Sequence, residues 1–515
     1  SSLDLKRKIS LSLKEANINS ALKQILKDTD SIYKIKGYHI IISKSLKEER
    51  KQKKETGKLT QTIRGIVIDS KTNAPIEFAS VKITEKPSLG AVTDSLGQFR
   101  IDNIPLGRYG IQTSFLGYTD NITNEILLTS SKETYLRIAL NENIHSLNEV
   151  IVRPELNKAQ VLNPIVITGG RMISMEEAGR FANGFDDPAR MATSFAGVAG
   201  NVGTNAVAIR GNSPQFTQWK LEGIEIPNPT HFADISGLGG GFLSALSTQV
   251  MGNFDFYNGA FGAEYNNALS GVFDTYMRNG NNQNYEHTIQ LGLMGVDLAS
   301  EGPISKKHRS SYIFNYRFST TSLATGGDAN AKYQDLSFKL NFPTKKAGTF
   351  SVWGLALLDR NKLKEEDKDK WETQADRQAI KNDLEKFSGG LTHKYFFNPT
   401  TYLRSTLAAT YSHDKVYGDQ YTKQESVVPV ADIKNSKWDF VFNTYLNKKF
   451  SSNHTNRTGI TFTELKFDLD YKVSPNFGLD KPMERIAKGD GSSSVFSAYS
   501  TSVINLSPNL TTSIG

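Results

Sequence analysis

The sequence contains no cysteine among its 515 residues. This absence excludes disulfide cross-links, thiolate–zinc and iron–sulfur centres, and catalysis by a cysteine nucleophile. The eight histidines are scattered, and no two of them stand four residues apart as a zinc-binding HExxH helix requires. GxSxG and P-loop sequences are also missing. The sequence therefore indicates a protein that is not an enzyme and that uses no metal or cofactor.

Long apolar runs are missing as well, since no stretch approaches the about 20 residues that a membrane-spanning helix needs. A membrane role must therefore use a closed β-barrel, the other structure that satisfies every backbone polar group in lipid. No signal peptide is visible, because Ser1 leads directly into a charged segment, as in a processed chain. The net charge of +8 is modest, and acidic residues interrupt its basic stretch at 44–58, so nucleic-acid binding is not indicated.

Residues 1–44 predict a small α+β domain. Asn17 can cap a helix with apolar residues at helical spacing, and residues 31–35 and 39–42 flank a turn as in a hairpin. This pattern resembles the secretin/TonB short N-terminal (STN) domain, which in that family docks an anti-sigma regulator; a purely structural βα unit explains it equally well. Residues 45–61 are polar and lack apolar periodicity, which predicts a linker.

Residues 62–142 contain short alternating segments at roughly 8–12-residue spacing, separated by Gly, Pro and Asp, which predicts a β-sandwich. Asp94 and Gly97 fit a tight turn better than a calcium site. The motifs are Ile63–Asp69, Ala79–Ile83, Thr93–Phe99 and Phe115–Tyr118. Together they resemble the carboxypeptidase regulatory-like domain that precedes many Bacteroidota outer-membrane transporters. The resemblance implies no peptidase activity, because no His/Glu zinc-ligand cluster is present.

Residues 143–163 read as a polar tether that carries a short β-prone segment. A segment of this kind suits strand addition to the sheet edge of a partner. Its residues are Glu149, Val150, Ile151 and Val152. The segment resembles a TonB box, which implies a TonB-type energy-transducing protein as partner. Residues 165–168 are a second candidate, and a plain edge strand is the alternative for either.

Residues 164–280 consist of short runs bounded by Gly, Asn and Pro, which predicts a compact mixed sheet with many loops. Their motifs are Ala208–Asn212, Trp219–Pro227, Asn258–Tyr265, Leu269–Asp274 and Arg278–Gly280. In this order they resemble the plug of TonB-dependent outer-membrane receptors, although Glu222 stands where that family more often has Asp. An ordinary soluble β-domain is the alternative.

Residues 281–515 alternate between apolar and polar side chains in the manner of transmembrane β-strands. On one segment Tyr312, Phe314, Tyr316 and Phe318 share a face, while Ile313, Asn315, Arg317 and Ser319 share the other. Apolar-out and polar-in alternation with aromatic residues near the strand ends is typical of outer-membrane barrels. The fold class is therefore mainly β, with a transmembrane antiparallel barrel behind the plug.

The connections predict the strand count. Short turns alternate with long polar loops at 320–332, 359–383, 414–436 and 470–493, and in such barrels the long loops face outside. This pattern requires two strands within 285–302 and reaches eleven strands by Gly515. Plugged transporters have about 22 strands, so we expect only the first half of a barrel here, with the rest beyond Gly515.

Five residues of the plug-like segment are candidate structural or gating positions. They are Arg210, Gly211, Glu222, Gly223 and Arg278. A charged group in a wet lumen usually pairs, so we expect the three charges to hold the plug together or against the barrel wall. Simple solvation of these charges is the alternative.

The resemblance implies TonB-dependent import of a scarce nutrient across the outer membrane of a Gram-negative bacterium, with periplasmic N-terminal domains. Siderophore, vitamin, glycan and peptide remain open as ligands. The implied partners are a TonB-type protein, outer-membrane lipid, an anti-sigma regulator at the N-terminal domain and a surface lipoprotein. One alternative is a non-transporting subunit of an outer-membrane assembly or secretion complex, since fold does not fix function. Another is a surface ligand-binding partner of a lipoprotein.

Overall fold

The computed structural model describes residues 18–26, 31–36, 39–44, 59–143, 161–182, 184, 187–200, 204–233, 240–241, 243–292, 295–320, 331–422, 424, 426–475, 482–507 and 510–515. The candidate TonB box at 149–152 lies outside these residues. The chain divides into two compact units, one formed by residues 1–67 and 76–140, the other by 68–75 and 141–515. Among the described residues, no helix has both the length and the apolar character that crossing a membrane requires.

The first unit begins with a short helix and a hairpin. Helix α1 (Ile18–Ile25) precedes β1 (Ser31–Lys36) and β2 (His39–Lys44), which pair antiparallel over their full lengths. The Tyr33 hydroxyl donates to the Asn19 carbonyl at 3.1 Å and so ties the hairpin to the helix. The predicted helix and hairpin are confirmed as elements, whereas the likeness to an STN domain stays a prediction.

A β-sandwich forms the rest of the first unit. Its strands are β3 (Thr60–Asp69), β4 (Ser80–Ile83), β5 (Lys86–Val92), β6 (Gln98–Pro105), β7 (Gly107–Ser114), β8 (Asn121–Leu128) and β9 (Thr134–Leu140). They form a three-stranded sheet in the order β6-β3-β9 and a four-stranded sheet in the order β5-β4-β7-β8. Buried Ile63, Ile83 and Ile111 belong to the core. Asp94 accepts hydrogen bonds from the backbone of Leu96 and Gln98, which makes the predicted turn.

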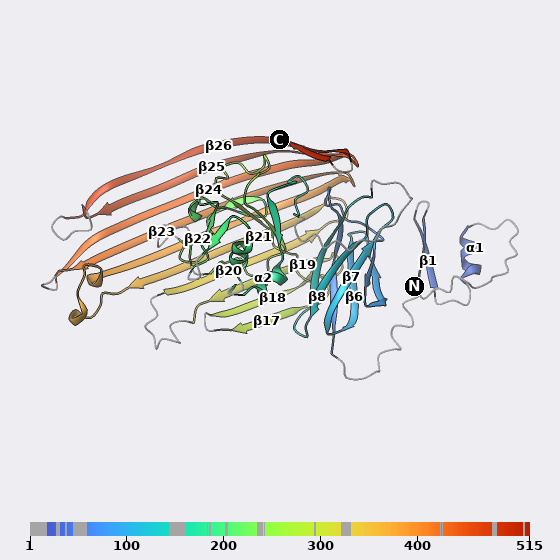
Figure 1. Ribbon diagram of the computed structural model, residues 1–515, viewed down its shortest axis with the longest axis horizontal. Helices are drawn as coiled ribbons and strands as arrows, with labels where there is room; N and C mark the ends of the chain where they lie inside the picture. Colours follow the sequence, from blue (N-terminus) through green and yellow to red (C-terminus); the bar gives the residue numbers. More distant parts are fainter. Residues whose placement is uncertain are drawn as a thin grey trace. The chain divides into compact units, whose positions relative to one another are not determined.

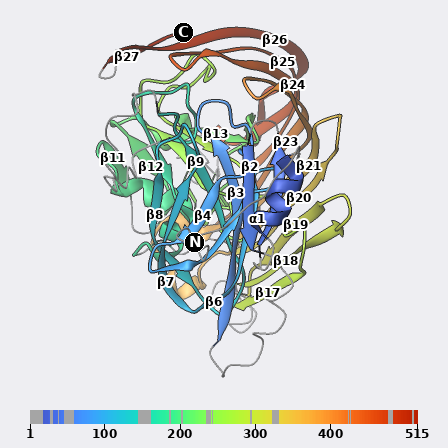
Figure 2. The same ribbon diagram turned by 90° about the vertical axis from the view of Figure 1, so that its right-hand side faces the viewer.

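An eleven-stranded antiparallel sheet, here the large sheet, dominates the second unit (Figure 1). Its strands are β17 (Glu286–Leu291), β18 (Val296–Ser305), β19 (Ser310–Phe318), β20 (Ala331–Pro343), β21 (Thr349–Leu363), β22 (Gln378–Asn398), β23 (Thr401–Tyr421), β24 (Val427–Ser451), β25 (His454–Val473), β26 (Glu484–Ser507) and β27 (Leu510–Ile514). They follow one another in sequence order, and β17 and β27 form the two edges. Viewed along its strands, the sheet curves through an arc (Figure 2). The prediction of eleven strands is confirmed.

Three of the expected long loops are shorter than predicted, because the strands continue into them. Strands β23 and β24 take up most of 414–436, and β25 and β26 likewise take up most of 470–493. Strands β21 and β22 extend into 359–383 from both sides. Backbone pairing persists between polar residues, as for Asp414 with Asn435. The ladder therefore continues through segments that carry polar side chains on both faces.

A smaller domain, here the inner domain (residues 161–280), packs against the large sheet. Its strands are β10 (Gly170–Ile173), β11 (Val198–Gly200), β12 (Val207–Ile209), β13 (Gln218–Leu221), β14 (Ile224–Ile226), β15 (Phe254–Tyr257) and β16 (Val272–Thr275). Its helices are α2 (Met175–Arg180) and α3 (Pro188–Met191), with one-turn 3-10 helices at Ala192–Ser194 and Pro214–Phe216. Five of the strands form a sheet in the order β10-β15-β16-β13-β14, in which only β13 and β16 run parallel. The predicted mixed sheet is confirmed.

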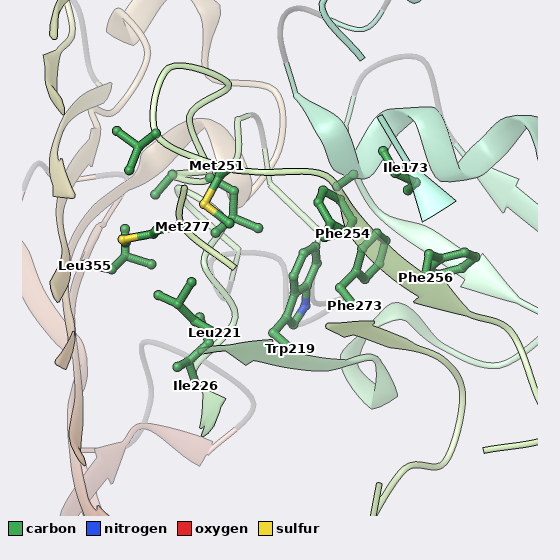
Figure 3. Packing of buried hydrophobic residues seen from close by; sticks show 14 of the residues in the cluster. Ile173, Trp219, Leu221, Ile226, Met251, Phe254, Phe256, Phe273, Met277 and Leu355 are labelled. Carbon is green, nitrogen blue, oxygen red and sulfur yellow. The ribbon is translucent and has the colours of Figure 1, made fainter. Parts of the chain in front are cut away.

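The inner domain and the large sheet share one apolar core. Trp219 and Phe273 stack with ring centroids 4.3 Å apart, and Phe254 and Phe256 pack beside them (Figure 3). The same cluster includes five residues of the large sheet. They are Ile313, Trp353, Leu355, Leu357 and Val441. The strictly polar inner face expected from the alternation is therefore interrupted, mainly on β21, where it meets the inner domain.

Candidate functional site

The two faces of the large sheet differ in polarity, with charged side chains on the face toward the inner domain and apolar side chains on the other. The face that contacts the inner domain, here the inward face, carries Arg317, Asp335 and Lys339, and all three are buried. The opposite or outward face carries Phe314 and Leu407, which are 38% and 58% exposed. Charges on the inward face are buried because the inner domain covers them. Each such charge needs a partner, since an unpaired buried charge is strongly destabilising.

Glu222 supplies the partner for two of these charges. It lies at the turn between β13 and β14, where Glu222 and Gly223 have φ of 51° and 81°, as a two-residue type I′ hairpin demands. Its carboxylate accepts hydrogen bonds from Lys339 Nζ at 2.7 Å and Arg404 Nη2 at 2.8 Å. The Met277 amide donates to the same group at 3.1 Å. Burial opposes ionisation, but Lys339 and Arg404 outweigh it and lower the pKa of Glu222.

Arg278 forms a second ion pair with the large sheet. Its guanidinium donates two hydrogen bonds to Glu301 on β18, at 2.7 Å to Oε2 and 2.5 Å to Oε1. It also donates to the Gln249 carbonyl within the inner domain. Glu301 further accepts from the Asn281 amide at 2.8 Å. This two-pronged geometry fixes the position and orientation of the guanidinium, which a lysine could not reproduce.

Arg210 and Gly211 lie elsewhere. Arg210 is exposed and adopts a φ of 51° directly after β12, and Gly211 follows with a φ of 82°. The guanidinium of Arg210 packs over Gly259, where an added Cβ would come within 2.9 Å of Nη2. These two residues therefore shape a turn inside the inner domain, and Arg210 lies apart from the contacts that Glu222 and Arg278 make with the large sheet.

His231 makes a fastening that the sequence analysis did not find. The fully buried imidazole lies between two carboxylates of the large sheet, with Nδ1 2.5 Å from Asp359 and Nε2 2.9 Å from Asp335. An imidazolium ring donates from both nitrogens, which matches a carboxylate on each side of the ring. Burial lowers the pKa of His231, but Asp359 and Asp335 outweigh burial and raise it. Arg317 also donates to Asp335, at 3.0 Å, so two cations balance two anions.

Glu264 makes the fourth fastening, also missed from the sequence. Arg457 on β25 donates from Nη1 to the Glu264 carboxylate at 2.9 Å and to Asn163 Oδ1 at 3.1 Å. Asn163 Nδ2 donates in turn to Glu264 at 2.5 Å and to the Tyr265 hydroxyl at 3.0 Å. Burial opposes ionisation of Glu264, but Arg457, Lys220 and the hydrogen bond from Asn163 together outweigh it and lower the pKa of the carboxyl. Asn163, near the start of the inner domain, thus contacts Arg457 of the large sheet.

Sequence reasoning identified Glu222 and Arg278 but none of their partners. The signal for one partner, Lys339, was the polar, inward-facing alternation on β20. Nothing in the sequence connects His231 to Asp335 and Asp359, which lie 104 and 128 positions away. No cluster of three or more metal-ligating side chains occurs in the part of the chain that the structure describes. The chemistry of the site is charge pairing that fastens one domain to another.

Residues 63–152 match the family model for the carboxypeptidase regulatory-like domain. This segment is similar to carboxypeptidase regulatory-like domains. The match includes strands β3 to β9 and runs on through residues 149–152. No curated protein sequence matches the chain.

Several solved structures are similar to the chain at low identity. The outer membrane transporter YddB from Escherichia coli is 12% identical with a TM-score of 0.43, over 65% of this chain and 54% of YddB. The ferric-catecholate import receptor Fiu from E. coli K12 is 10% identical with a TM-score of 0.41, over 67% of this chain and 69% of Fiu. The ferric yersiniabactin uptake receptor FyuA from Yersinia pestis is 10% identical with a TM-score of 0.43, over 68% and 64%.

The chain spans only part of these proteins, about half of YddB and under two thirds of FyuA. All three TM-scores lie below 0.5. The functional proposal therefore rests on the chain's own contacts.

Proposed function

We propose that this chain inserts into the outer membrane and imports a scarce nutrient by TonB-dependent active transport. The inverted polarity of the large sheet is the observation that carries the proposal. Neighbouring strands place Phe314 beside Phe338, and Ala409 beside Phe440, on the outward face. A curved sheet with exposed apolar side chains outside and buried charges inside is stable where lipid surrounds it and polar material fills it.

The outward face offers a broad apolar surface to lipid. Its exposed members include Phe314, Leu336, Leu358, Phe387, Leu391, Leu407, Phe440, Phe442, Ile460, Phe462 and Phe496. Contiguous exposed apolar surface of this extent on a protein in water would promote association, whereas acyl chains solvate it. This feature supports the outer membrane as the location and its lipid as a partner.

The inner domain supports gated transport in preference to an open pore. Four sets of buried charges fasten it to strands of the large sheet, through Glu222, Arg278, His231 and Glu264. Breaking such pairs leaves charges uncompensated, so release of the domain requires energy. An energy-transducing partner that adds a strand at residues 149–152 would supply this energy mechanically. Siderophores, vitamins, glycans and peptides remain candidate ligands.

Both N-terminal domains are assigned to the periplasm in this proposal. The helix and hairpin of residues 18–44 would dock an anti-sigma regulator, as the resemblance to STN domains implies. A surface lipoprotein is the other candidate partner. The proposed activity is transport, and it includes no catalytic step.

Deletion of residues 149–152 tests the proposal. Cells carrying either form would be assayed for binding and uptake of labelled ferric siderophores, cobalamin, oligosaccharides and peptides. We expect at least one probe to bind both forms equally and to enter only with the intact chain. Uptake that persists after the deletion would contradict energy coupling. Copurification with envelope proteins in fixed ratio, together with indifference to loss of the TonB-type protein, would favour the non-transporting subunit.

A further inference from the structure

Two buried carboxyl groups face each other inside the inner domain. Asp255 of β15 lies directly opposite Asp274 of β16 in the antiparallel ladder, and both side chains are buried. Residues in this relation share a face of the sheet, with their Cβ atoms about 4.5–5.5 Å apart. Like charges at this separation repel, and a protein interior screens them poorly. Ionisation of both groups would therefore destabilise the pairing of β15 with β16.

The hydrogen bonds to the two carboxyl groups are unequal. Asp255 accepts three, from the Leu162 amide at 2.7 Å, the Asn163 amide at 2.8 Å and the Tyr257 hydroxyl at 2.8 Å. Asp274 accepts at Oδ2, from the Tyr265 hydroxyl at 2.8 Å and the Tyr276 hydroxyl at 3.4 Å. Its Oδ1 is buried and has no hydrogen-bond partner among the residues that the structure describes. A charge on a buried oxygen without a partner is costly, which favours a neutral carboxyl group in the pair.

The surroundings of the pair are apolar and aromatic. Tyr257 and Val272 stand two residues away on the same strands and therefore on the same face of the sheet. They pack with Tyr265 in a cluster of buried residues. Burial of this kind disfavours the charged form, so it raises the pKa of Asp255 to about 7 and also raises the pKa of Asp274.

The charged groups around the pair are engaged with other residues. Lys220 of β13 pairs in register with Asp274. Its ammonium group lies 4.8 Å from the Tyr265 ring centroid and donates to the Glu264 carbonyl oxygen at 3.4 Å. Two further charges that act on Asp274 belong to ion pairs with the large sheet, which are Glu264–Arg457 and Arg404–Glu222.

Three tyrosines also border the pair and stay neutral, because burial raises their pKa values further above neutrality. They are Tyr257, Tyr265 and Tyr276. A proton on one of the two carboxyl groups is therefore the direct way to remove the repulsion between them.

We propose that Asp255 and Asp274 form a proton-binding site that holds one proton between them at neutral pH. Because the two groups interact, they titrate as a pair. The bound proton removes one of two facing charges and so stabilises the pairing of β15 with β16. Its ligand is the proton alone, and all its contacts lie within the inner domain, so the site does not depend on the transport proposal.

Infrared spectroscopy of the full chain in detergent tests for the proton. A neutral carboxyl group has a C=O stretch distinct from the bands of a carboxylate, and the wild type should show it at neutral pH and lose it at alkaline pH. Asp255→Asn and Asp274→Asn should each remove the intensity of one neutral carboxyl group. The double variant should remove no more than either single one, because the two groups share a single proton.

Glu225→Gln is the control, since it removes an exposed carboxyl group of β14 and should leave the band unchanged. A wild type without the band would overturn the site, and this result needs no variant to fold. Loss of intensity in only one of the two aspartate variants, or a loss in the double variant equal to the sum of two groups, would overturn the sharing.

Proton release and melting temperature test the effect on folding. Unfolded aspartates have a pKa of about 3.9, so unfolding the wild type in urea at neutral pH should release about one proton more than unfolding Asp274→Asn. The Asn side chain also keeps the shape of a neutral carboxyl group. The variant should therefore melt above the wild type at about pH 9, and its advantage should shrink toward pH 6. Equal proton release in the two proteins, or a melting difference that does not vary with pH, would refute the site.

Discussion

Glu222 of the inner domain accepts a hydrogen bond from Arg404 of β23 at 2.8 Å, and the two residues are 182 positions apart in the sequence. The same carboxylate binds Lys339 of β20, so one anion neutralises cations on two separate strands. Both cations are buried against the inner domain. The Glu222 carboxylate therefore ties the β13–β14 hairpin to β20 and β23, beside the apolar core that the inner domain shares with the large sheet.

Replacement of Glu222 by Gln should destabilise the inner domain strongly. The amide keeps the shape of the side chain but leaves Lys339 and Arg404 buried without a counter-charge. We expect a loss of about 3–5 kcal/mol in the free energy of unfolding. Urea titration followed by intrinsic tryptophan fluorescence would measure it, since Trp219 lies in the core of the inner domain.

Glu225→Gln is the control for this change. Glu225 lies on the adjacent strand β14 and is exposed. It takes no part in the ion pairs with the large sheet described above. Its replacement should alter the free energy of unfolding by about 1 kcal/mol or less, as for other surface charges. Equal losses in the two variants would show that the Glu222 pairs do not hold the domain.

Two glycines with the same backbone conformation allow the cost of backbone strain to be distinguished from the cost of displacing Arg404. Gly211 and Gly223 have φ of 82° and 81°, so alanine at either position carries a left-handed penalty of about 1–2 kcal/mol. An added Cβ at Gly211 meets open space, whereas at Gly223 it lies 2.9 Å from Arg404 Nη1. Gly223→Ala should therefore destabilise the inner domain more than Gly211→Ala, by about 1 kcal/mol or more, because Arg404 must move away from Glu222. The same urea titration would compare them, and equal losses would indicate that Arg404 has room to shift.

The architecture was readable from the sequence because it follows from local period and turn chemistry. Alternation placed Phe314 and Arg317 on opposite faces, and parity of the turns required two strands before residue 302. The structure has both features, with β17 paired to β18 from Glu286 to Leu291. The ends of the strands were misjudged, since polar residues such as Asp414 suggest a loop although the ladder continues through them.

The ion pairs between the inner domain and the large sheet could be predicted from the sequence only in part, for a physical reason. A charge at the tip of a hairpin, such as Glu222, indicates that a partner exists, but the identity of the partner depends on strand register and on how two domains meet. His231 gave no such signal, because a lone histidine beside Phe232 has many satisfactory environments. Its role follows only from the approach of Asp335 and Asp359 from two neighbouring strands.

Stability should depend on pH through His231. Its pKa is raised in the folded state, so its contribution is fully present below the unfolded pKa of about 6.5 and is lost as pH rises through the folded pKa. The melting temperature of the wild type should exceed that of His231→Gln most at pH 6 and below. The difference should shrink toward alkaline pH.

The wild type must be compared with His231→Gln because titration of Asp255 also makes the free energy of unfolding fall as pH rises. Burial raises the pKa of Asp255 to about 7, so the folded state holds that proton over a range in which the unfolded state has lost it. Stability from this group also falls as pH rises from about 4 to 7. Asp255 is present in both proteins, so its effect cancels in the difference. A difference that does not vary with pH would contradict a charged His231.

The outward face of the large sheet makes the membrane proposal testable by a single substitution. Leu407 is the seventh of the 21 residues of β23 and is 58% exposed, so Leu407→Arg would be nearly neutral if water surrounded this face. In a bilayer the charge should cost about 2–4 kcal/mol, as for arginine near the midplane of other barrels. Urea titrations of the full-length protein folded into phosphatidylcholine liposomes would measure the loss. Leu116→Arg is the control, because Leu116 is 81% exposed in the carboxypeptidase regulatory-like domain and should tolerate a charge in the same liposomes. Equal tolerance of arginine at both positions would mean that lipid does not cover the outward face.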